Sequence, residues 1–330
     1  MDLAKTSFDD DDVRVSYVVA LDVGGTSMKG GLVTRSGEVT PFAGHPTERE
    51  RGPAAVVAAI RAYVGELAGH GRARYGAEPS GVGLAVPGIV TSSTAVYSAN
   101  IGWRDVPAGE FVPGDLPACL GHDVRTGGLA ESVFGAGRDT ADFLFLPIGT
   151  GIAGAVVVRG EPYGGVHGWG GEIGHTTVWP SGELCACGQI GCLETYASAS
   201  AVSRRYERRS GRAATAKQVV TLAASGDPVA REVFGEAIEA LAISLASYTL
   251  LLDPSLIVIG GGLGEAGAVL FDPLRERLAA RLAFCDPPEL RPAALGVHAG
   301  MLGAALLGWQ AAGEPGVGAD WTPETLLGAH

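Results

Sequence analysis

The sequence predicts an α/β protein built from two related halves, and two observations support this prediction. Short apolar runs rich in β-branched residues alternate with segments of helical periodicity along most of the 330 residues. In addition, residues 18–33 (VVALDVGGTSMKGGLV) and 143–158 (FLFLPIGTGIAGAVVV) match at a constant offset of 125 positions. Alternation of this kind favours largely parallel sheets covered by helices.

The individual elements follow from local pattern. The expected strands are short, apolar and bounded by glycine, and they occupy 18–23, 82–86, 143–148, 155–158 and 256–259. Helical spacing of apolar residues covers 54–69, 194–209 and 230–252, and another helix is expected from Asp123 to Gly135. The acidic residues 1–15 predict a disordered tail, and the Gly/Pro-rich residues 313–330 predict a flexible one.

Each copy of the repeat reads as a strand, a Gly-Thr turn and a returning strand. Leu21 matches Leu146, and Gly24 matches Gly149. Two such halves would face each other across a cleft, each offering a glycine-rich hairpin, which is the actin-like (ribonuclease H-like) architecture. We expect a small domain at 16–122, completed by a C-terminal helix at about 299–312, and a large domain at 123–298. Chance similarity of two apolar hairpins is the alternative.

Composition narrows the classes of function. The net charge is −12, and no apolar run reaches the ~18–20 residues that span a bilayer, so neither nucleic acid nor a membrane is an expected partner. The N-terminus lacks an apolar signal segment, which predicts a cytoplasmic location. Cys119 and Cys285 are expected to be free buried thiols of a reducing compartment. The largest basic cluster is expected to be a solvated helix face: Arg204, Arg205, Arg208 and Arg209.

The first glycine turn has the chemistry of a phosphate site. Gly24 and Gly25 leave backbone N–H groups open to phosphate oxygens, and the hydroxyl of Thr26 adds a donor. Lys29 either supplies positive charge to that site or is simply a solvated lysine. No GxxxxGK[ST] motif occurs, so the turn is not a P-loop.

The second glycine turn, at residues 149–154 (GTGIAG), formally matches a dinucleotide fingerprint. That interpretation fails because a helix must follow those glycines, whereas residues 155–158 (AVVV) predict a strand. Thr150 and Gly151 therefore belong to a second phosphate hairpin. A third turn, with Gly261 and Gly262, follows the apolar run LIVIG.

A metal site is expected in the segment GEIGHTTVWPSGELCACGQIGCLE. One histidine and three cysteines lie within eighteen positions, the ligand set of a closed tetrahedral zinc site: His175, Cys185, Cys187 and Cys192. Glu172 and Glu194 flank the cluster, so the metal would hold two carboxylates in fixed places. The alternative is a surface zinc knuckle that only staples a loop.

In combination these motifs closely resemble the ROK family (repressors, open reading frames and sugar kinases) over about residues 17–310. The resemblance implies a two-domain fold with an ATP/sugar cleft and ATP-dependent phosphorylation of the 6-hydroxyl of a glucose-type sugar. Mg²⁺ would bridge the phosphates, the zinc would be structural, and Gly261 and Gly262 would border the adenosine. Homodimers or homotetramers are also implied.

The resemblance also assigns roles to residues. Asp123 and Glu131 match the frame of the family's catalytic base, although His122 and Arg125 replace two flanking asparagines. Taken alone, Asp123 could equally cap its helix. Asn100, with Trp103, matches the sugar-binding N-x-x-W motif. Further sugar contacts are implied for Glu172, His175 and Glu194, and Pro87–Gly88 either lines the sugar pocket or is only a turn.

The motifs are compatible with two classes of sugar. Glucose is the first expectation, and N-acetylglucosamine, N-acetylmannosamine or kanosamine is the alternative. Two cation-capable side chains beside the base, His122 and Arg125, would disfavour a free ammonium but tolerate an acetamido group. A sugar-responsive repressor is the remote alternative, because repressors place a helix-turn-helix domain before the first strand. Here about 16 residues, largely acidic, precede that strand.

Overall fold

The computed structural model describes residues 15–322 and Leu326. Its first sheet has the strand order β3-β2-β1-β5-β9, with β4 attached to β2. In this sheet β1, β5 and β9 are parallel, whereas β1 and β2 form an antiparallel hairpin. Its strands are β1 (Tyr17–Val23), β2 (Ser27–Thr34), β3 (Val39–Pro41), β4 (His45–Pro46), β5 (Gly81–Val86) and β9 (Ala118–His122). A small antiparallel sheet comprises β6 (Ile89–Val90), β7 (Thr94–Tyr97) and β8 (Arg104–Pro107).

The second large sheet repeats this arrangement, with the order β12-β11-β10-β13-β14. Here β10, β13 and β14 are parallel, and β10 and β11 form the antiparallel hairpin. Its strands are β10 (Phe143–Pro147), β11 (Ala155–Val158), β12 (Glu161–Pro162), β13 (Leu256–Gly260) and β14 (Glu289–Pro292). The predicted duplication is confirmed. The expectation of largely parallel sheets is wrong, because a strand that returns after a short turn must pair antiparallel.

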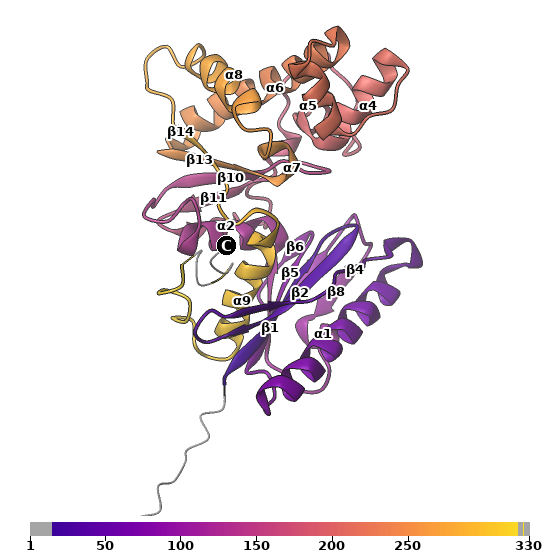
Figure 1. The fold of residues 1–330 in the computed structure, drawn as a ribbon, viewed down its shortest axis with the longest axis vertical. Helices are drawn as coiled ribbons and strands as arrows, with labels where there is room; N and C mark the ends of the chain where they lie inside the picture. Colours follow the sequence, from indigo (N-terminus) through magenta and orange to yellow (C-terminus); the bar gives the residue numbers. More distant parts are fainter. Residues whose placement is uncertain (1–14, 323–325, 327–330) are drawn as a thin grey trace, which may run out of the picture.

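The helices form layers between and outside the two sheets (Figure 1). Helix α1 (Pro53–Tyr75) covers the outer face of the first sheet, and α9 (Ala299–Ala311) covers its inner face. Helix α2 (Asp123–Phe134) covers the inner face of the second sheet and packs on α9. The other helices belong to the outer part of the second half: α3 (Glu194–Ala197), α4 (Ala199–Ser210), α5 (Ala216–Ala224), α6 (Pro228–Leu252), α7 (Gly261–Gly264) and α8 (Ala268–Ala279).

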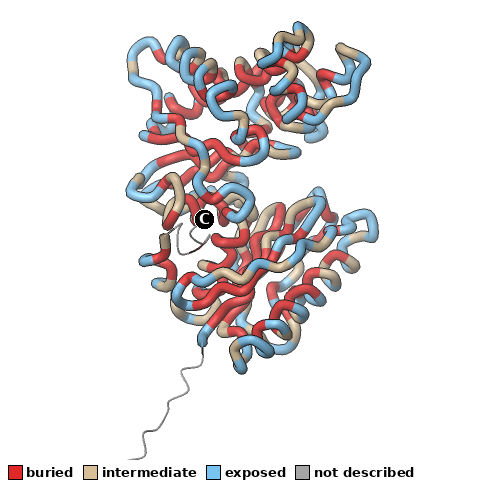
Figure 2. The backbone as a smooth tube through the Cα atoms, viewed as in Figure 1, coloured by how far each residue is buried: buried red, intermediate tan, exposed pale blue. Residues whose placement is uncertain are grey.

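Alternation along the strands explains these layers, and the buried residues concentrate in the sheets and their facing helices (Figure 2). In β10, Phe143 and Phe145 pack in the core shared with α2 and α9, while Leu144 and Leu146 pack toward α6. Both faces are covered, so the strands are almost continuously apolar. Close packing of α2 on α9 requires Gly303, where a Cβ atom would lie 2.0 Å from the carbonyl oxygen of Thr126.

Two local expectations are corrected by the structure. The helix expected at 194–209 is interrupted at Ser198, whose extended backbone ends α3 and whose side chain accepts from the N–H of Ala201 to start α4. The tail expected at 313–330 is packed over part of its described length. Trp321 is 3% exposed, lies against Phe134, and donates to the carbonyl oxygen of Arg35 at 3.1 Å. Residues 1–14 of the expected acidic tail lie outside the described residues.

Two further features concern burial. Cys119 is buried as expected, whereas Cys285 is only partly covered. Among residues 15–322, α6 is the one helix whose length and apolar composition match those of a bilayer-spanning helix, and 56% of its apolar window is buried inside the protein. Its buried residues pack in the outer core of the second sheet. Burial of this extent is typical of the core helix of a folded domain.

Candidate active site

Asp123 begins helix α2 directly after strand β9, at the junction of the two halves. Its Oδ1 accepts from the N–H of Val124 at 2.8 Å. The N-cap of the helix is His122, whose Nδ1 accepts from the N–H of Arg125 at 3.3 Å. The alternative in which Asp123 merely caps the helix is therefore wrong, because the preceding residue does so. This leaves the second carboxylate oxygen of Asp123 available for chemistry.

The surroundings of Asp123 suit a proton acceptor at neutral pH. Burial above all, together with the charges of Asp22 and Glu172, raises the pKa of this carboxyl to about 7, against the opposing effects of the Val124 N–H and Arg125. The side chain nevertheless keeps 28% of its surface accessible, which is enough for a small substrate to reach it. A base of this pKa accepts a proton efficiently near neutrality.

Asp22 is a functional candidate that the sequence interpretation missed. It lies near the end of β1, just before the first glycine turn, and pairs across the hairpin with Lys29. Burial raises its pKa to about 6, and Lys29 opposes that rise. The start of α9 packs on it, since a Cβ at Gly300 would lie 2.5 Å from Oδ2 of Asp22. A single carboxylate within the otherwise apolar strand YVVALDV was the available signal.

The first glycine turn is held in shape by its own backbone and by Thr47. The N–H of Gly24 donates to the carbonyl oxygen of Ser27 at 2.9 Å, and the hydroxyl of Thr47 donates to that of Gly24 at 2.7 Å. Thr26 and Lys29 are both exposed beside this turn. An exposed hydroxyl and ammonium beside a glycine turn are suited to phosphate oxygens.

The second and third glycine turns pack together. Gly149 accepts from the N–H of Ala199 at 2.8 Å, and the carbonyl oxygen of Thr150 accepts from the hydroxyl of Ser200 at 2.5 Å. Gly261 has a φ of 72°, and a Cβ there would lie 2.5 Å from the carbonyl oxygen of Ile148. Strand β11 follows the second turn, which confirms that this turn is not a dinucleotide fingerprint.

The carboxylates and the amide expected to contact sugar differ in their surroundings. Glu194 accepts from the N–H of Ile152 at 2.8 Å, so it is tied to the second glycine turn. Glu172 lies close enough to Asp123 to influence its pKa. Asn100 lies on a separate exposed turn, which is closed by the N–H of Gly102 donating to the carbonyl oxygen of Ser98 at 2.7 Å. Within the described residues no hydrogen bond joins Asn100 to Asp123.

Pro87–Gly88 is a turn packed beneath the Asn100 segment. Gly88 has a φ of 103°, and a Cβ there would lie 2.2 Å from the carbonyl oxygen of Tyr97. Trp103 is buried against Phe111 with ring centroids 5.6 Å apart, which anchors the end of the Asn100 turn. Glu131 is likewise structural, because its carboxylate accepts from the N–H groups of Ala136 and Leu295 at 2.6 and 3.0 Å.

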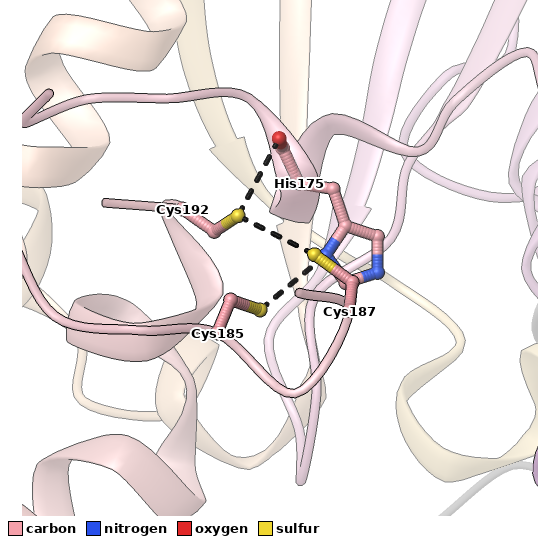
Figure 3. A group of neighbouring side chains, drawn as sticks. All are labelled: His175, Cys185, Cys187 and Cys192. Atoms are coloured by element: carbon pink, nitrogen blue, oxygen red, sulfur yellow. Dashed lines mark hydrogen bonds between the residues drawn. The ribbon is translucent and has the colours of Figure 1, made fainter. Parts of the chain in front are cut away.

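The histidine and the three cysteines come together as the sequence predicted (Figure 3). Their ligand atoms all lie within 4.8 Å of one another: His175, Cys185, Cys187 and Cys192. Nδ1 of His175 lies 3.8 Å from the sulfur of Cys185, and the sulfurs of Cys187 and Cys192 are 3.7 Å apart. Nδ1 faces the sulfurs, which leaves Nε2 for another partner.

The chemistry of this cluster fits a divalent metal. Burial and the neighbouring thiols raise the pKa of Cys192 to about 12, so the sulfurs cannot readily ionise together without a cation. One nitrogen and three sulfurs form a recurrent ligand set for structural zinc. The connecting loop is tight, because Gly191 has a φ of 78° and a Cβ there would lie 1.7 Å from the carbonyl oxygen of Trp179.

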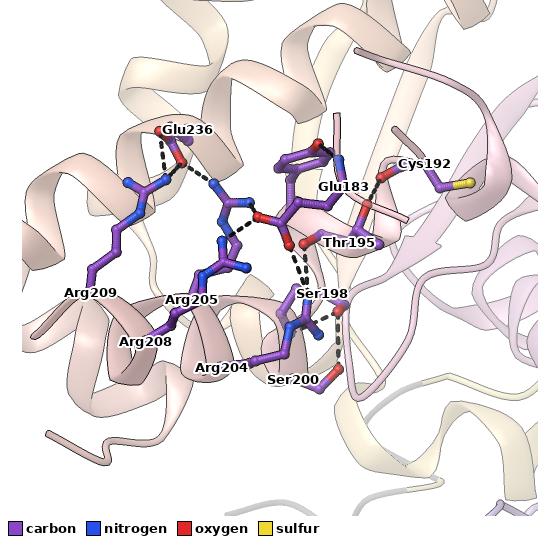
Figure 4. A network of polar contacts seen from close by, with 12 residues as sticks. Glu183, Cys192, Thr195, Ser198, Ser200, Arg204, Arg205, Arg208, Arg209 and Glu236 are labelled. Carbon is purple, nitrogen blue, oxygen red and sulfur yellow. Dashed lines mark hydrogen bonds and ion pairs between the residues drawn. The ribbon is translucent and has the colours of Figure 1, made fainter. Parts of the chain in front are cut away.

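The expectation that the arginines of α4 form a solvated face is wrong for Arg205 (Figure 4). Its side chain is 3% exposed and forms ion pairs with Glu183, in the loop before Cys185, and with Glu236 on α6. It also lies over the ring of Tyr196, with its Cζ 4.6 Å from the centroid. Arg208 is half-exposed and pairs with Glu183 at 2.5 Å. The cluster therefore fastens the cysteine loop to the helical layer.

We expect Arg205→Met to lower the free energy of unfolding by about 1–3 kcal/mol. Removing one partner of a buried pair leaves charge without compensation, although Arg208 and Arg209 keep contact with the two carboxylates. Arg208→Met is the matched control, since an exposed ion pair contributes at most about 1 kcal/mol. Urea unfolding of both variants measures the difference. Equal losses in the two would show that Arg205 has no special role.

The side chains of His122 and Arg125 do not lie as expected from their place beside Asp123 in the sequence. His122 is 8% exposed, and burial, aided by the charge of Arg125, lowers its pKa to about 3. It is neutral at physiological pH and occupied as the helix cap. Arg125 donates to the carbonyl oxygens of Gly168 and Gly170 at 3.0 and 3.3 Å. Both side chains therefore form hydrogen bonds with backbone atoms.

Fold and site together define an actin-like two-domain α/β protein. The family model described as "ROK family" matches residues 18–311. A glucokinase of Halalkalibacterium halodurans is 35% identical over 317 residues, covering 89% of this chain and 94% of the relative. The ROK hexokinase structure from Thermus thermophilus has 32% identity and a TM-score of 0.75, covering 89% of this chain and 98% of that chain.

A ROK family glucokinase from Streptomyces griseus, solved in complex with glucose and AMPPNP, has 29% identity and a TM-score of 0.77. That alignment covers 89% of this chain and all of the other chain. The present chain belongs to the ROK family.

Proposed function

We propose that this protein is an ATP-dependent glucokinase, transferring the γ-phosphoryl group to the 6-hydroxyl of glucose. The observation that carries this proposal is Asp123, a recessed carboxylate whose pKa is raised to about 7 at the junction of two glycine-hairpin sheets. The relatives named above, a hexokinase and two glucokinases that align over most of this chain, support the same activity.

In this proposal Asp123 accepts the proton of the sugar hydroxyl as it attacks phosphorus. The two hairpin turns, at Gly24, Gly25 and Thr26 and at Thr150 and Gly151, hold the phosphates, and Lys29 adds positive charge. Mg²⁺ bound with ATP would offset the negative charge that develops during transfer. Gly261 and Gly262 border the adenosine. Closure of the two halves excludes water, which would otherwise compete with the sugar for the phosphoryl group.

The sugar is held in this proposal by Asn100, Glu172, His175 and Glu194. An amide that both donates and accepts suits a vicinal diol, and Nε2 of His175 is the ring nitrogen that faces away from the sulfurs. Zinc would be structural, fixing the loop that carries these side chains. Glucose is favoured over an amino sugar, because the amino-sugar alternative depended on His122 and Arg125, whose polar groups bond backbone atoms.

The same proposal includes the domain boundaries, the oligomeric state and the cellular location of the protein. Residues 16–122 with 299–312 form the small domain, and 123–298 form the large one. The packing of α9 on β1, β5 and β9 supports this division. We propose a homodimer or homotetramer and a cytoplasmic location, where ATP is available and thiols stay reduced. Sedimentation measurements of the purified protein would determine the oligomeric state.

The test is ATP-coupled turnover with a panel of glucose, mannose, N-acetylglucosamine, N-acetylmannosamine and kanosamine. We expect the highest kcat/KM for glucose, with ADP and a 6-phosphate as products. A higher value for any amino sugar would replace the proposed substrate. Turnover with none of the five would overturn the proposed activity.

We expect kcat/KM for the sugar to fall below about pH 7, because Asp123 must be ionised to accept a proton and its pKa is about 7. Asp22→Asn should move this acid limb to lower pH. The charge of Asp22 raises the pKa of Asp123, so its removal stabilises the ionised base. The pH profiles of parent and variant check this. A limb that stayed in place or moved upward would contradict the assignment.

A further inference from the structure

Arg125 lies two residues after the proposed base, on the first turn of α2, and its guanidinium reaches the loop of residues 163–171. Nη1 donates to the carbonyl oxygens of Gly168 and Gly170 at 3.0 and 3.3 Å. These two carbonyls flank Trp169, whose own carbonyl oxygen accepts from the N–H of Glu172 at 3.3 Å. One side chain thus connects the helix of the base to the backbone that carries Glu172.

The loop of residues 163–171 is fixed at both ends but free of strand pairing between them. The backbone N–H of Tyr163 donates to the carbonyl oxygen of Val156 at 2.7 Å, and the carbonyl oxygen of Gly171 accepts from the N–H of Gly154 at 2.7 Å. Its middle lies against the small half, because a Cβ at Gly168 would be 3.1 Å from Cγ2 of Ile89. The hydrogen bonds from Arg125 therefore hold the loop where it contacts Ile89 in the small half.

Charge gives Arg125 a second effect. Asp123 is faced by Asp22 from β1, by Glu172 from the loop, by neutral His122 at the end of β9, and by Arg125 on its own helix. Arg125 is the cation among these groups. It lowers the pKa of Asp123, and the negative charges of Glu172 and Asp123 favour its own charged form. A planar guanidinium holds two acceptors in a fixed geometry while staying charged, whereas an amide lacks the charge and a lysine ammonium lacks the fixed geometry.

We propose that Arg125 is a positioning residue, which clasps the loop of residues 163–171 to the helix of the base and so sets the placement of Glu172 relative to Asp123. It also supplies the positive charge beside both carboxylates. The inference rests on the proposed roles of Asp123 as base and Glu172 as sugar ligand.

The test compares Arg125→Lys and Arg125→Gln with the parent and with Arg138→Gln, an exposed arginine just beyond the other end of α2. Lysine keeps the charge, but its shorter and flexible side chain holds the two carbonyls less firmly than the planar guanidinium does, so KM for glucose should rise at least about threefold while the acid limb of kcat/KM stays in place. Glutamine also removes the charge. KM should then rise about tenfold, and the acid limb should move upward by about half a pH unit, because an uncompensated carboxyl is harder to ionise.

KM for ATP should change less than twofold in both Arg125 variants, and Arg138→Gln should match the parent throughout. A merely structural role would raise KM for both substrates and lower the melting temperature without moving the acid limb. Arg125→Gln with an unmoved acid limb and KM for glucose within twofold of the parent would overturn the inference. A combined Arg125→Gln, Glu172→Gln variant should lose no more glucose affinity than Glu172→Gln alone. Additive losses would show that Arg125 does not act through Glu172.

The proposed function and this inference can be contradicted independently of each other. If Asp123→Asn kept full activity, the assignment of Asp123 as the base would be wrong. The effect of Arg125 on KM for glucose through Glu172 would still be measurable. If the base were confirmed and Arg125→Gln behaved as the parent, only the clasp would be wrong.

Discussion

Replacing Asp123 by asparagine is expected to lower kcat about 10²–10⁴-fold while leaving the binding of glucose and ATP nearly unchanged. General-base catalysis typically contributes a factor of this size. Asparagine keeps the shape of the side chain and can still accept from the N–H of Val124, which Asp123 does at 2.8 Å. The helix cap is unaffected, because His122 provides it. Steady-state kinetics and calorimetric titration with each substrate measure the two effects.

The same variant should be more stable than the parent at pH 8. Burial raises the pKa of Asp123 to about 7, so the folded protein holds this proton more tightly than the unfolded chain does. Its contribution to stability is full below the unfolded pKa of about 4 and is lost as pH rises through about 7. Asparagine removes that loss, and a gain of at least about 1 kcal/mol at pH 8 is expected, with little change at pH 4. Parent-like turnover together with unchanged stability would show that Asp123 is neither the base nor a buried charge.

Much of this arrangement could be predicted because the relevant signals are local. Strand β1 and its copy β10 are each an apolar run followed by a Gly-Thr turn, and that pattern alone identified both hairpins. The cysteine cluster was equally predictable from the sequence, because its ligands lie close together in the chain and their chemistry allows few alternatives. Rejection of the dinucleotide fingerprint depended only on the strand that follows it.

Features that depend on three-dimensional neighbours could not be predicted in this way. Arg205 has the sequence context of an exposed helix. It is buried because Glu183 and Glu236, from other segments, form ion pairs with it. Trp321 follows a Gly/Pro-rich stretch, yet it packs on Phe134 from the middle of the chain. His122 and Arg125 were expected to influence the choice of sugar because they lie beside Asp123 in the sequence. Adjacency in sequence does not determine which way a side chain points.

The other large effect concerns the metal. We expect one zinc ion per protomer, and we expect its removal to raise KM for glucose at least about tenfold and to lower the melting temperature. Zinc would bind the four clustered side chains: His175, Cys185, Cys187 and Cys192. Without a cation, the neighbouring thiols oppose the ionisation of Cys192. The loop they close leads directly to Glu194, so its order reaches the proposed sugar site. Elemental analysis, together with kinetics before and after chelation, measures these outcomes.

Two cysteine variants separate the metal from the rest of the fold. Cys187→Ser removes the most exposed of the three sulfur ligands, so it should weaken zinc binding and raise KM for glucose while disturbing packing least. Cys119→Ser is the matched control, because that thiol lies in β9 away from the cluster. KM for ATP should change less than KM for glucose in Cys187→Ser, since the ion pairs of Arg205 still hold the loop against α4 and α6. Freshly purified protein without stoichiometric zinc would contradict the assignment. A metal-free protein with parent-like KM for glucose would show that these ion pairs, and not the zinc, order the sugar-facing side chains.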